Sequence, residues 1–481
     1  MKRKFIILIY LGLSLFFSGC ALYAAPKKVA VKIPEKFKYS VKTRGYPIKN
    51  DWWKNFKDKE LNTLVGKALK NNLNYLIAVK NIQVAKTYVS QNESNLFPDI
   101  NFSYASSRNK LPGYESSISS GRASASTIIY NLNQAGLNAS YELDVWHQIN
   151  NAVNQAKANV SVSREDADVI KLTLISNVAQ SYFQIIALNS GIKNLKKQYL
   201  AEKEILKINL VQYKDGLING EPALDAKIAL EAIKTELNNS IKLKEITQNT
   251  LAYYLGKYPE KFKIGKKTKK YNFNGFNNIN YTRLIPPNIP SLILTKRPDV
   301  KEAEYNVLSY AYAKKASLAN FFPVFNLTGE YGYASFSLNN FIADANSVWS
   351  FGLNILVPLF NYKKNISIYE RSKLQYEQAV LNYRNTIINA FSETDSALAS
   401  YKRDFKTLKS YENNLAYSSK LFRIYNVQYR TGIAGRITYL TYKLNLLNAE
   451  YNLINQNLLL QEDIIDIYNA LGMGLKQNVQ I

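Results

Sequence analysis

The chain has 481 residues, and 62 Lys and Arg against 36 Asp and Glu give it a formal charge of +26. Because 47% of the residues are hydrophobic, a wholly disordered chain is excluded. A single Cys and a single His exclude a disulfide framework and a metal site built from these residue types. Gly and Pro are scarce and clustered, which favours long uninterrupted helices over several compact lobes.

The N-terminus reads as a targeting segment. Three basic residues at positions 2–4 precede an apolar run from Phe5 to Phe17, which is too short to span a bilayer comfortably. We therefore expect a signal peptide over residues 1–19. No later apolar stretch reaches 18 residues, so the sequence predicts no transmembrane helix.

The signal peptide ends in Ser18-Gly19-Cys20, which resembles the lipobox of bacterial lipoproteins. The resemblance implies that the Cys20 thiol receives a diacylglycerol group and becomes the mature N-terminus. We accordingly expect a lipidated N-terminal segment over residues 20–52. The alternative is ordinary cleavage near Ala24 or Ala25 without a lipid.

The rest of the chain contains a duplication, found by comparing its two halves. One set of residues recurs 225 positions later: Asn81, Asn95, Phe97, Pro98 and Asn101 recur as Asn306, Asn320, Phe322, Pro323 and Asn326. A second set recurs 216 positions later: Tyr213, Gly216, Leu224, Leu255 and Gly256 recur as Tyr429, Gly432, Leu440, Leu471 and Gly472. These matches predict a first repeat over 53–256, a connector over 257–296, a second repeat over 297–472 and a C-terminal tail over 473–481.

Each repeat predicts a helix, an extended hairpin, a very long helix, a Gly turn and another long helix. In the hairpins, apolar residues occupy every second position, as in Leu137, Ala139, Tyr141, Leu143 and Val145, and in Trp349, Phe351, Leu353, Ile355 and Val357. Segments of about nine to eleven residues can cross a membrane as tilted strands whose polar face lines water. Trp146 and Trp349 lie near strand ends, where interfacial aromatic residues sit.

A soluble sandwich would show the same alternation, with its apolar face packed inward. Only four strands are predicted, however, and a closed barrel needs roughly eight or more. A lipid-exposed version of these strands must therefore be oligomeric.

The second repeat contains a long heptad pattern without Gly or Pro between Asn361 and Thr431. Its expected seam alternates steps of three and four residues, at positions 366, 369, 373, 376, 380, 383, 387, 390, 394, 397 and 401. At about 1.5 Å per residue, a helix of some 65 residues would extend on the order of 100 Å. The alternative interpretation is a structural coiled-coil rod, which leaves the preceding hairpins unexplained.

Six short strings along this duplicated frame resemble the outer-membrane efflux proteins of Gram-negative bacteria, a TolC-like family, and specifically the lipoprotein channels of RND-type tripartite pumps. They are Asp51-Trp52-Trp53, Leu96-Phe97-Pro98, Tyr141-Glu142-Leu143-Asp144-Val145-Trp146, Arg297-Pro298-Asp299, Val357-Pro358-Leu359-Phe360 and Tyr429-Arg430-Thr431-Gly432. The resemblance implies a mixed α and β membrane protein that forms a homotrimer. Each chain would give four strands to one twelve-stranded β-barrel, continued by a periplasmic α-helical barrel.

The resemblance also implies a function. The chain would be a passive exit duct for drugs, metals or other small toxic solutes, anchored by lipid in the outer membrane and extending into the periplasm. Its implied partners are a periplasmic adaptor (membrane fusion) protein, an inner-membrane RND transporter and outer-membrane lipid, with no cofactor. The alternatives are an outer-membrane duct for type I protein secretion and a periplasmic coiled-coil scaffold.

Several residues have expected structural roles. Pro98, Pro323 and Pro358 mark passages between helix and strand, where a missing N–H stops the preceding element. Gly216 and Gly432 are expected to end the long helices in a left-handed conformation. Asp299 is expected to cap a helix, with Glu302 completing a capping box.

By resemblance, the helical turns near Gly216 and Gly432 form the periplasmic entrance. The candidate residues for its constriction are Tyr213, Glu221, Asp225, Tyr429, Arg430 and Arg436, since threefold symmetry would triple each group around the axis. The alternative for each charge is a solvated helix end.

An enzyme and a nucleic-acid-binding protein are both disfavoured. The basic residues are dispersed, apart from a cluster at 266–270, and no nucleic-acid recognition motif accompanies them. No recognisable set of nucleophile, base and orienting group occurs, and Gly-rich phosphate loops are missing from the sequence. His147 is expected to form hydrogen bonds beside Trp146 and not to bind a metal.

Overall fold

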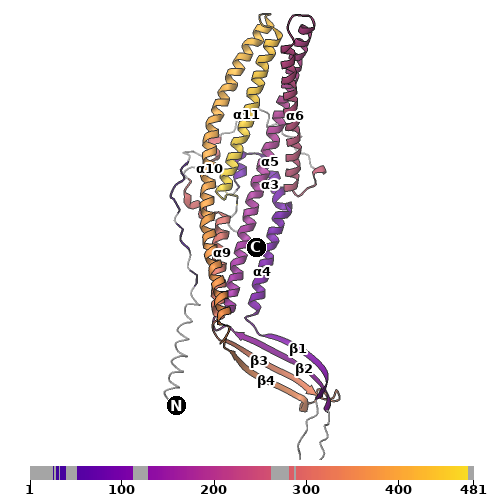
Figure 1. The fold of residues 1–481 in the computed structure, drawn as a ribbon, viewed down its shortest axis with the longest axis vertical. Coiled ribbons are helices and arrows are strands. Elements are labelled where there is room, and N and C mark those ends of the chain that lie inside the picture. The colour runs from indigo at the N-terminus through magenta and orange to yellow at the C-terminus, as the bar shows by residue number, and fades with distance from the viewer. Residues whose placement is uncertain are drawn as a thin grey trace, which may run out of the picture. The chain divides into compact units, whose positions relative to one another are not determined.

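The computed structural model describes residues 25–26, 29–31, 33–39, 51–111, 128–261, 281–285 and 289–474. The predicted signal peptide, the lipid attachment residue Cys20 and most of the C-terminal tail lie outside these ranges. The main elements run in the order α3 (Lys59–Asn71), α4 (Leu73–Ser94), β1 (Asp99–Leu111), β2 (Ile128–Leu143), α5 (Gln148–Lys214), α6 (Glu221–Tyr254), α9 (Pro298–Ala319), β3 (Val324–Ser335), β4 (Ser347–Leu356), α10 (Tyr362–Arg430) and α11 (Arg436–Ala470) (Figure 1).

This order confirms the predicted duplication of a β-hairpin followed by a long helical hairpin. The described residues also form short elements: η1 (Trp52–Phe56), η2 (Pro259–Lys261), α8 (Tyr281–Leu284), η3 (Ser291–Lys296) and η4 (Asp344–Asn346). The chain packs as two units, each built from both repeats. Counting only described residues, unit 1 is drawn from Met1–Ala30, Gln83–Val162 and Glu304–Asn382, and unit 2 from Val31–Ile82, Ser163–Ala303 and Tyr383–Ile481.

Unit 1 contains one antiparallel sheet with the strand order β1-β2-β3-β4. The register places apolar residues in rows across all four strands, and one row contains Phe102, Leu137, Tyr331 and Trp349. The adjacent row on the opposite face contains Asn101, Asn138, Glu330 and Ser350. The alternation read from the sequence thus becomes one apolar face and one polar face.

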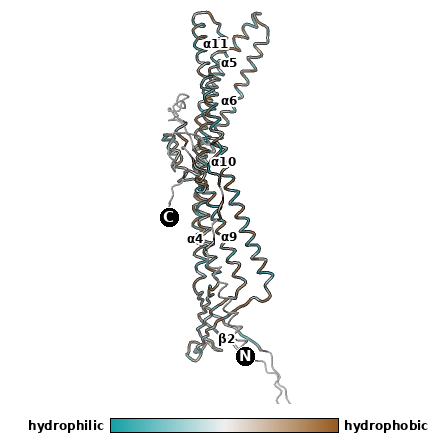
Figure 2. Tube along the Cα trace, turned by 90° about the vertical axis from the view of Figure 1, so that its left-hand side faces the viewer, coloured by the Kyte–Doolittle hydropathy of each residue, from teal (hydrophilic) through white to brown (hydrophobic). Residues whose placement is uncertain are grey.

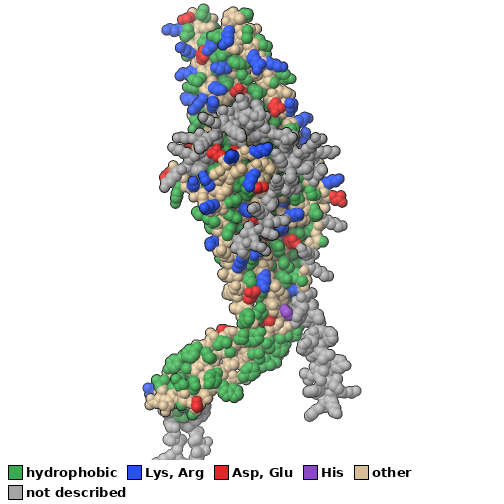
Figure 3. Space-filling model, turned by 180° about the vertical axis from the view of Figure 1, so that it is seen from behind, with side chains coloured by type: hydrophobic (Ala, Val, Ile, Leu, Met, Phe, Trp, Pro, Cys, Tyr) green, Lys and Arg blue, Asp and Glu red, His purple; other side chains and the backbone are tan. Residues whose placement is uncertain are grey.

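The apolar face of the sheet is exposed in the single chain. Phe102 is 71%, Phe351 74% and Trp349 77% exposed, although these are large hydrophobic side chains. Figure 3 shows hydrophobic side chains gathered over the sheet, whereas Lys and Arg are scattered over the helices. A contiguous exposed apolar surface of this kind marks a contact with lipid or with another protein.

Helix α5 starts at a strand-to-helix passage that explains one of the sequence motifs. Asp144 accepts hydrogen bonds from the backbone N–H groups of Ile149 (2.9 Å) and Asn150 (2.8 Å), which satisfies the open donors of the first turn. Trp146 stacks on Phe322 at 4.7 Å and donates its indole N–H to the carbonyl of Pro323 (2.7 Å). Trp146 therefore ties the two repeats together inside unit 1, whereas Trp349 is the exposed aromatic residue expected near a strand end.

The predicted seam of α10 holds in only part of the helix. Tyr383, Ile387, Ala390, Thr394 and Tyr401 are buried as expected. Nearer the start of α10 the buried residues are Asn365, Ser372 and Ala379, each displaced by one position from an expected seam residue. In a straight α-helix, positions that repeat every seven residues rotate around the helix axis by about 20° per heptad. Over about five heptads this rotation amounts to roughly one residue, so the buried stripe shifts by one position relative to a strict heptad pattern.

In unit 2, both repeats use the same contact to close the end of their last helix. Asn72 is buried and donates from its side-chain amide to the carbonyl of Tyr254 (3.1 Å), the last residue of α6. In the second repeat, Arg297 occupies the position 225 residues after Asn72 and donates to the carbonyl of Ala470, the last residue of α11. We call these two contacts the helix-end clasps; they satisfy carbonyl groups that the helix leaves open.

The clasp in the second repeat corrects one expectation. Helix α9 begins at Pro298, so Asp299 lies within its first turn and is not the N-cap residue, although its Oδ1 accepts from the backbone N–H of Val300 (2.9 Å). The Asp299 carboxylate also accepts from Nε (3.0 Å) and Nη2 (2.8 Å) of Arg297, whose Nη2 reaches Glu393 (2.8 Å) as well. The Arg297-Pro298-Asp299 string thus orients a buried guanidinium against α11, which is a role that the local sequence pattern did not indicate.

The helices carry no long apolar block. Figure 2 shows hydrophobic and hydrophilic residues alternating along them. Among the residues that the structure describes, no helix has the length and hydrophobicity needed to cross a bilayer.

The sheet generates a first prediction at Gly332, which faces Gly136 across β2 and β3. A Cβ at Gly332 would lie 2.2 Å from the carbonyl oxygen of Ala135, so G332A should force the strands apart and cost about 1–3 kcal/mol. In the control G329A the new Cβ would meet no atom closer than 4.0 Å. Denaturant unfolding should show a lower midpoint for G332A alone, and equal midpoints would contradict the packing described.

Candidate functional site

The helical hairpins of unit 2 end in two glycine turns, which lie at the same end of that unit (Figure 1). Gly216 follows α5 with a φ of +73°, and Gly432 follows α10 with a φ of +78°. In each turn the next residue donates its N–H across the helix end, from Leu217 to Gln212 and from Ile433 to Gln428. Glycine suits both positions because a left-handed backbone is strained for other residues.

Arg436 organises the second turn. Its guanidinium lies 5.1 Å from the ring centroid of Tyr429 and 5.0 Å from that of Tyr439. Its Nε donates to Oε1 of Glu204 on α5 at 2.7 Å, which links the second hairpin to the first. This hydrogen bond lowers the pKa of the Glu204 carboxyl and raises that of Arg436, so the pair is ionised at neutral pH.

Aromatic pairs continue this contact along α10 and α11. Tyr429 stacks on Tyr439 at 5.0 Å, and Tyr425 stacks on Tyr442 at 3.6 Å with nearly parallel rings. Phe422 lies 5.6 Å from Tyr439. The two helices of the second hairpin are therefore joined by contacts between aromatic rings near their turn.

A small apolar cluster packs between the two helical hairpins near their turns. Ala201 and Ile205 of α5 pack with Ala226 of α6 and Leu440 of α11, all of them buried. The cluster joins the two hairpins, so the position of Arg436 relative to Glu204 is fixed by packing as well as by charge.

The remaining predicted constriction residues do not gather around Arg436. Tyr213 lies over the backbone of Gly220, where an added Cβ would be 3.4 Å from the ring. Glu221 is the first residue of α6 and Arg430 the last residue of α10, and each charge suits the dipole of its helix end. Glu221, Asp225 and Arg430 are exposed, and their side chains make no hydrogen bond or ion pair to another residue in the described part of the chain.

Five residues that contact this site were not among those predicted from the sequence: Glu204, Tyr439, Phe422, Tyr425 and Tyr442. Phe422, Tyr425 and Tyr429 are spaced by three and four residues on α10, and Arg436 and Tyr439 by three on α11, so helical periodicity could have placed each set on one face. Glu204 lies on the other hairpin, and no spacing within one helix could have identified it.

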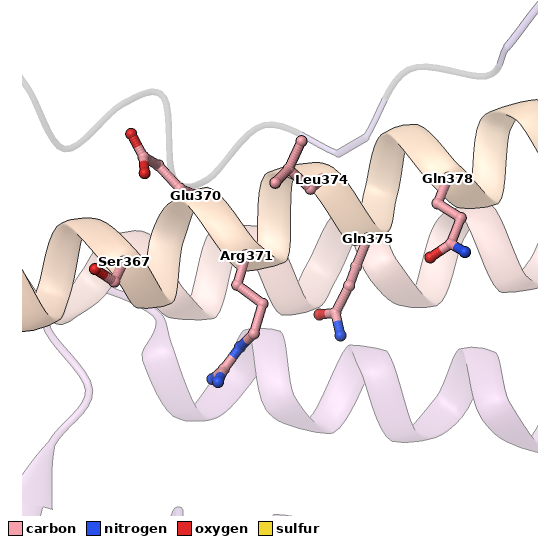
Figure 4. Close-up of a pocket in the computed structure, with 6 residues that line it drawn as sticks. All are labelled: Ser367, Glu370, Arg371, Leu374, Gln375 and Gln378. Carbon is pink, nitrogen blue, oxygen red and sulfur yellow. The ribbon is translucent and has the colours of Figure 1, made fainter.

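The structure describes one further surface feature, a groove on α10. A groove of about 520 Å³ in unit 1 is lined by Ser367, Glu370, Arg371, Leu374, Gln375 and Gln378. All belong to α10, and Figure 4 shows Glu370 and Arg371 pointing to different sides of the helix, so their polar groups do not converge. Within the described residues, no group of three or more His, Cys, Asp and Glu side chains is placed to hold a metal ion.

The second prediction concerns the contacts of Arg436. R436A removes the ion pair and both ring contacts, which together contribute about 1–2 kcal/mol in a half-exposed setting. Hydrogen exchange of the amides around Tyr429 and Glu204 should accelerate by roughly five- to thirtyfold. The control R430A removes an exposed cation from the same turn and should leave these rates nearly unchanged. Equal acceleration in both variants would show that Arg436 has no special role.

Comparison with known proteins places this architecture in a family. The family model described as outer membrane efflux protein matches residues 64–257 and 289–473. The chain is 25% identical over 476 residues to the cation efflux system protein CusC of Escherichia coli O6:H1, covering 96% of this chain and 98% of that protein. It is 27% identical over 458 residues to the toxin and drug export protein A of Aggregatibacter actinomycetemcomitans, covering 91% and 92%.

The fold comparison agrees. The crystal structure of the CmeC outer membrane channel of Campylobacter jejuni superposes with a TM-score of 0.81 and 25% identity, covering 95% of both chains. The family match covers both repeats, and the protein is a transport component and not an enzyme. With its duplicated hairpins, its one-sided sheet and these matches, the chain belongs to the outer membrane efflux protein family.

Proposed function

We propose that the protein is the passive exit duct of a tripartite efflux pump, open to drugs, metals or other small toxic solutes. The observation that carries this proposal is the sheet of unit 1, whose apolar face is exposed while its opposite face is polar. Lipid on one side and water on the other would suit these two faces. The strands have 10 to 16 residues, which is long enough to cross a bilayer when tilted.

Three copies would complete the sheet. β1 and β4 each pair with a single neighbouring strand in the described sheet. The backbone N–H and C=O groups along the outer edge of each strand therefore have no partner strand in this sheet. An unpaired edge is not tolerated in hydrocarbon, and joining β4 of one copy to β1 of the next removes it. We propose a homotrimer with a twelve-stranded barrel, as the family resemblance implies, and with the long helices forming the periplasmic conduit.

The glycine turns would then form the periplasmic entrance. Threefold symmetry would repeat Tyr213, Glu221 and Asp225 of the first hairpin around the axis, and likewise Tyr429, Arg430 and Arg436 of the second. Rings of charges or hydroxyl groups can constrict a pore and select among solutes. The contacts of Arg436 with Glu204 support a closed arrangement of the two hairpins, since they join them within one copy.

The anchor and the partners complete the proposal. Cys20 would carry the lipid that holds the chain in the outer membrane, in keeping with its place after an apolar leader. A periplasmic adaptor would join the entrance to an inner-membrane RND transporter, which would supply the energy. The printed names of the relatives, cation efflux and toxin and drug export, support a role in export.

Protein export is a second candidate, because one relative is named a toxin and drug export protein. A coiled-coil scaffold is disfavoured by the family match, which covers both hairpins and both long helices.

The third prediction tests the membrane-facing sheet with two adjacent residues of β4. Phe351 lies on the apolar face and Ser350 on the polar face. F351K would place a charge in lipid at about 2–4 kcal/mol per copy, so the outer-membrane fraction should lose its heat-modifiable oligomer. S350K should keep the oligomer and its conductance in planar bilayers. A wild-type protein that stays monomeric and never conducts would refute the duct.

The fourth prediction distinguishes the two kinds of cargo. Deleting the gene should increase sensitivity to drugs, metals or bile salts, and a plasmid copy should restore resistance. Unchanged sensitivity together with the loss of one exported protein would favour type I secretion instead.

A further inference from the structure

The α10–α11 hairpin contains a pair of carboxyl groups that the proposed function does not use. Along this hairpin, Thr394 donates to the carbonyl of Ala470 (3.1 Å), and Gln456 donates its amide N–H to the carbonyl of Asp404 (3.1 Å). Asp463 lies between Gln456 and Ala470 on α11, and its side chain is within hydrogen-bonding reach of the side chain of Asp404 on α10. The pair therefore sits on the packing interface of the two helices.

Two ionised carboxylates cannot hold this interface together. Both would offer only acceptors, so a hydrogen bond between them requires that one of them carries a proton. Oδ2 of Asp463 is buried and has no hydrogen-bond partner among the described residues. A charge on Asp463 would thus be both poorly solvated and adjacent to a second carboxylate.

The groups around Asp463 do not compensate such a charge. Tyr401 of α10 is 1% exposed, and its buried hydroxyl has no partner among the described residues. The other charged groups acting on Asp463 are Glu462 and Asp466 of its own helix, and Asp466 accepts from Gln180 of α5 (2.8 Å). The charged side chains with the largest effect on Asp463 are therefore all carboxylates.

Burial and the neighbouring Asp404 raise the pKa of Asp463 to about 8. Burial also raises the pKa of Tyr401, so the tyrosine stays neutral and offers no alternative charge. At neutral pH the proton is therefore bound to Asp463 in the folded chain.

The first repeat has a neutral contact at the same place. Thr247 lies 216 residues before Asp463, which is the displacement that relates the two glycine turns, and it donates to Oε1 of Gln184 on α5 at 3.2 Å. A hydroxyl and an amide do not titrate in this range. The contact in the first hairpin that corresponds to Asp463 therefore does not titrate in this range.

We propose that Asp404 and Asp463 share one proton that holds α10 against α11, and that release of this proton loosens the second hairpin. The direction in which folding stability changes with pH follows from the difference in the pKa of Asp463 between the folded and unfolded chain. The folded chain keeps a proton that an unfolded Asp releases near its ordinary pKa of 3.8, so stability falls as pH rises from there to about 8 and then levels off.

The fifth prediction tests the shared proton with the full chain in detergent. D463N retains a neutral donor toward Asp404, so its melting temperature should fall by less than half as much as that of the wild type between pH about 6 and about 9.5. The control D225N removes an exposed carboxyl on the first hairpin and should keep the full wild-type decrease. Equal decreases in the wild type and D463N would overturn the proposal.

Infrared spectroscopy provides a second measurement that needs no variant to fold. The wild type should show the carbonyl band of a protonated carboxylic acid at neutral pH, and this band should disappear with a midpoint near the pKa of about 8. Wherever D463N folds, it should lack the titrating band. A wild-type spectrum without such a band would overturn the proposal, whether or not the protein conducts in bilayers.

Discussion

Backbone hydrogen bonding constrains the sheet more strongly than any side-chain contact does. Residues 133–140 of β2 and 325–333 of β3 have paired neighbours on both sides, whereas β1 and β4 are edge strands of the described sheet. Because no water is available in hydrocarbon, an edge strand there must find a partner. The apolar face and the two edges together make a single copy incomplete, and the proposed trimer follows from that requirement.

The duplication made much of this fold predictable. Two constant displacements in sequence identified the repeats, and a two-residue period identified the strands and their faces before any contact was known. These features are local or periodic, so they remain visible in one sequence. The register that sets Leu137 beside Tyr331 agrees with the faces expected for both strands.

The contacts between distant segments were less accessible. The ion pair of Arg436 with Glu204 and the clasp of Arg297 on Ala470 each join residues far apart in the chain. The seam of α10 was misplaced near its start because helical drift accumulates over heptads, which a fixed repeat cannot express. Sequence periodicity thus described the elements well and their mutual contacts poorly.

The helix-end clasps of the two repeats use side chains of different chemistry at corresponding positions. Asn72 holds a carbonyl with a neutral amide, whereas Arg297 uses a guanidinium that also engages Asp299 and Glu393. An amide is replaceable by other small donors, but a buried cation commits its two acidic neighbours to remain acidic. The helix-end clasp of the second repeat therefore tolerates fewer substitutions than that of the first. Amino-acid changes should accumulate faster around Asn72 than around Arg297 during evolution.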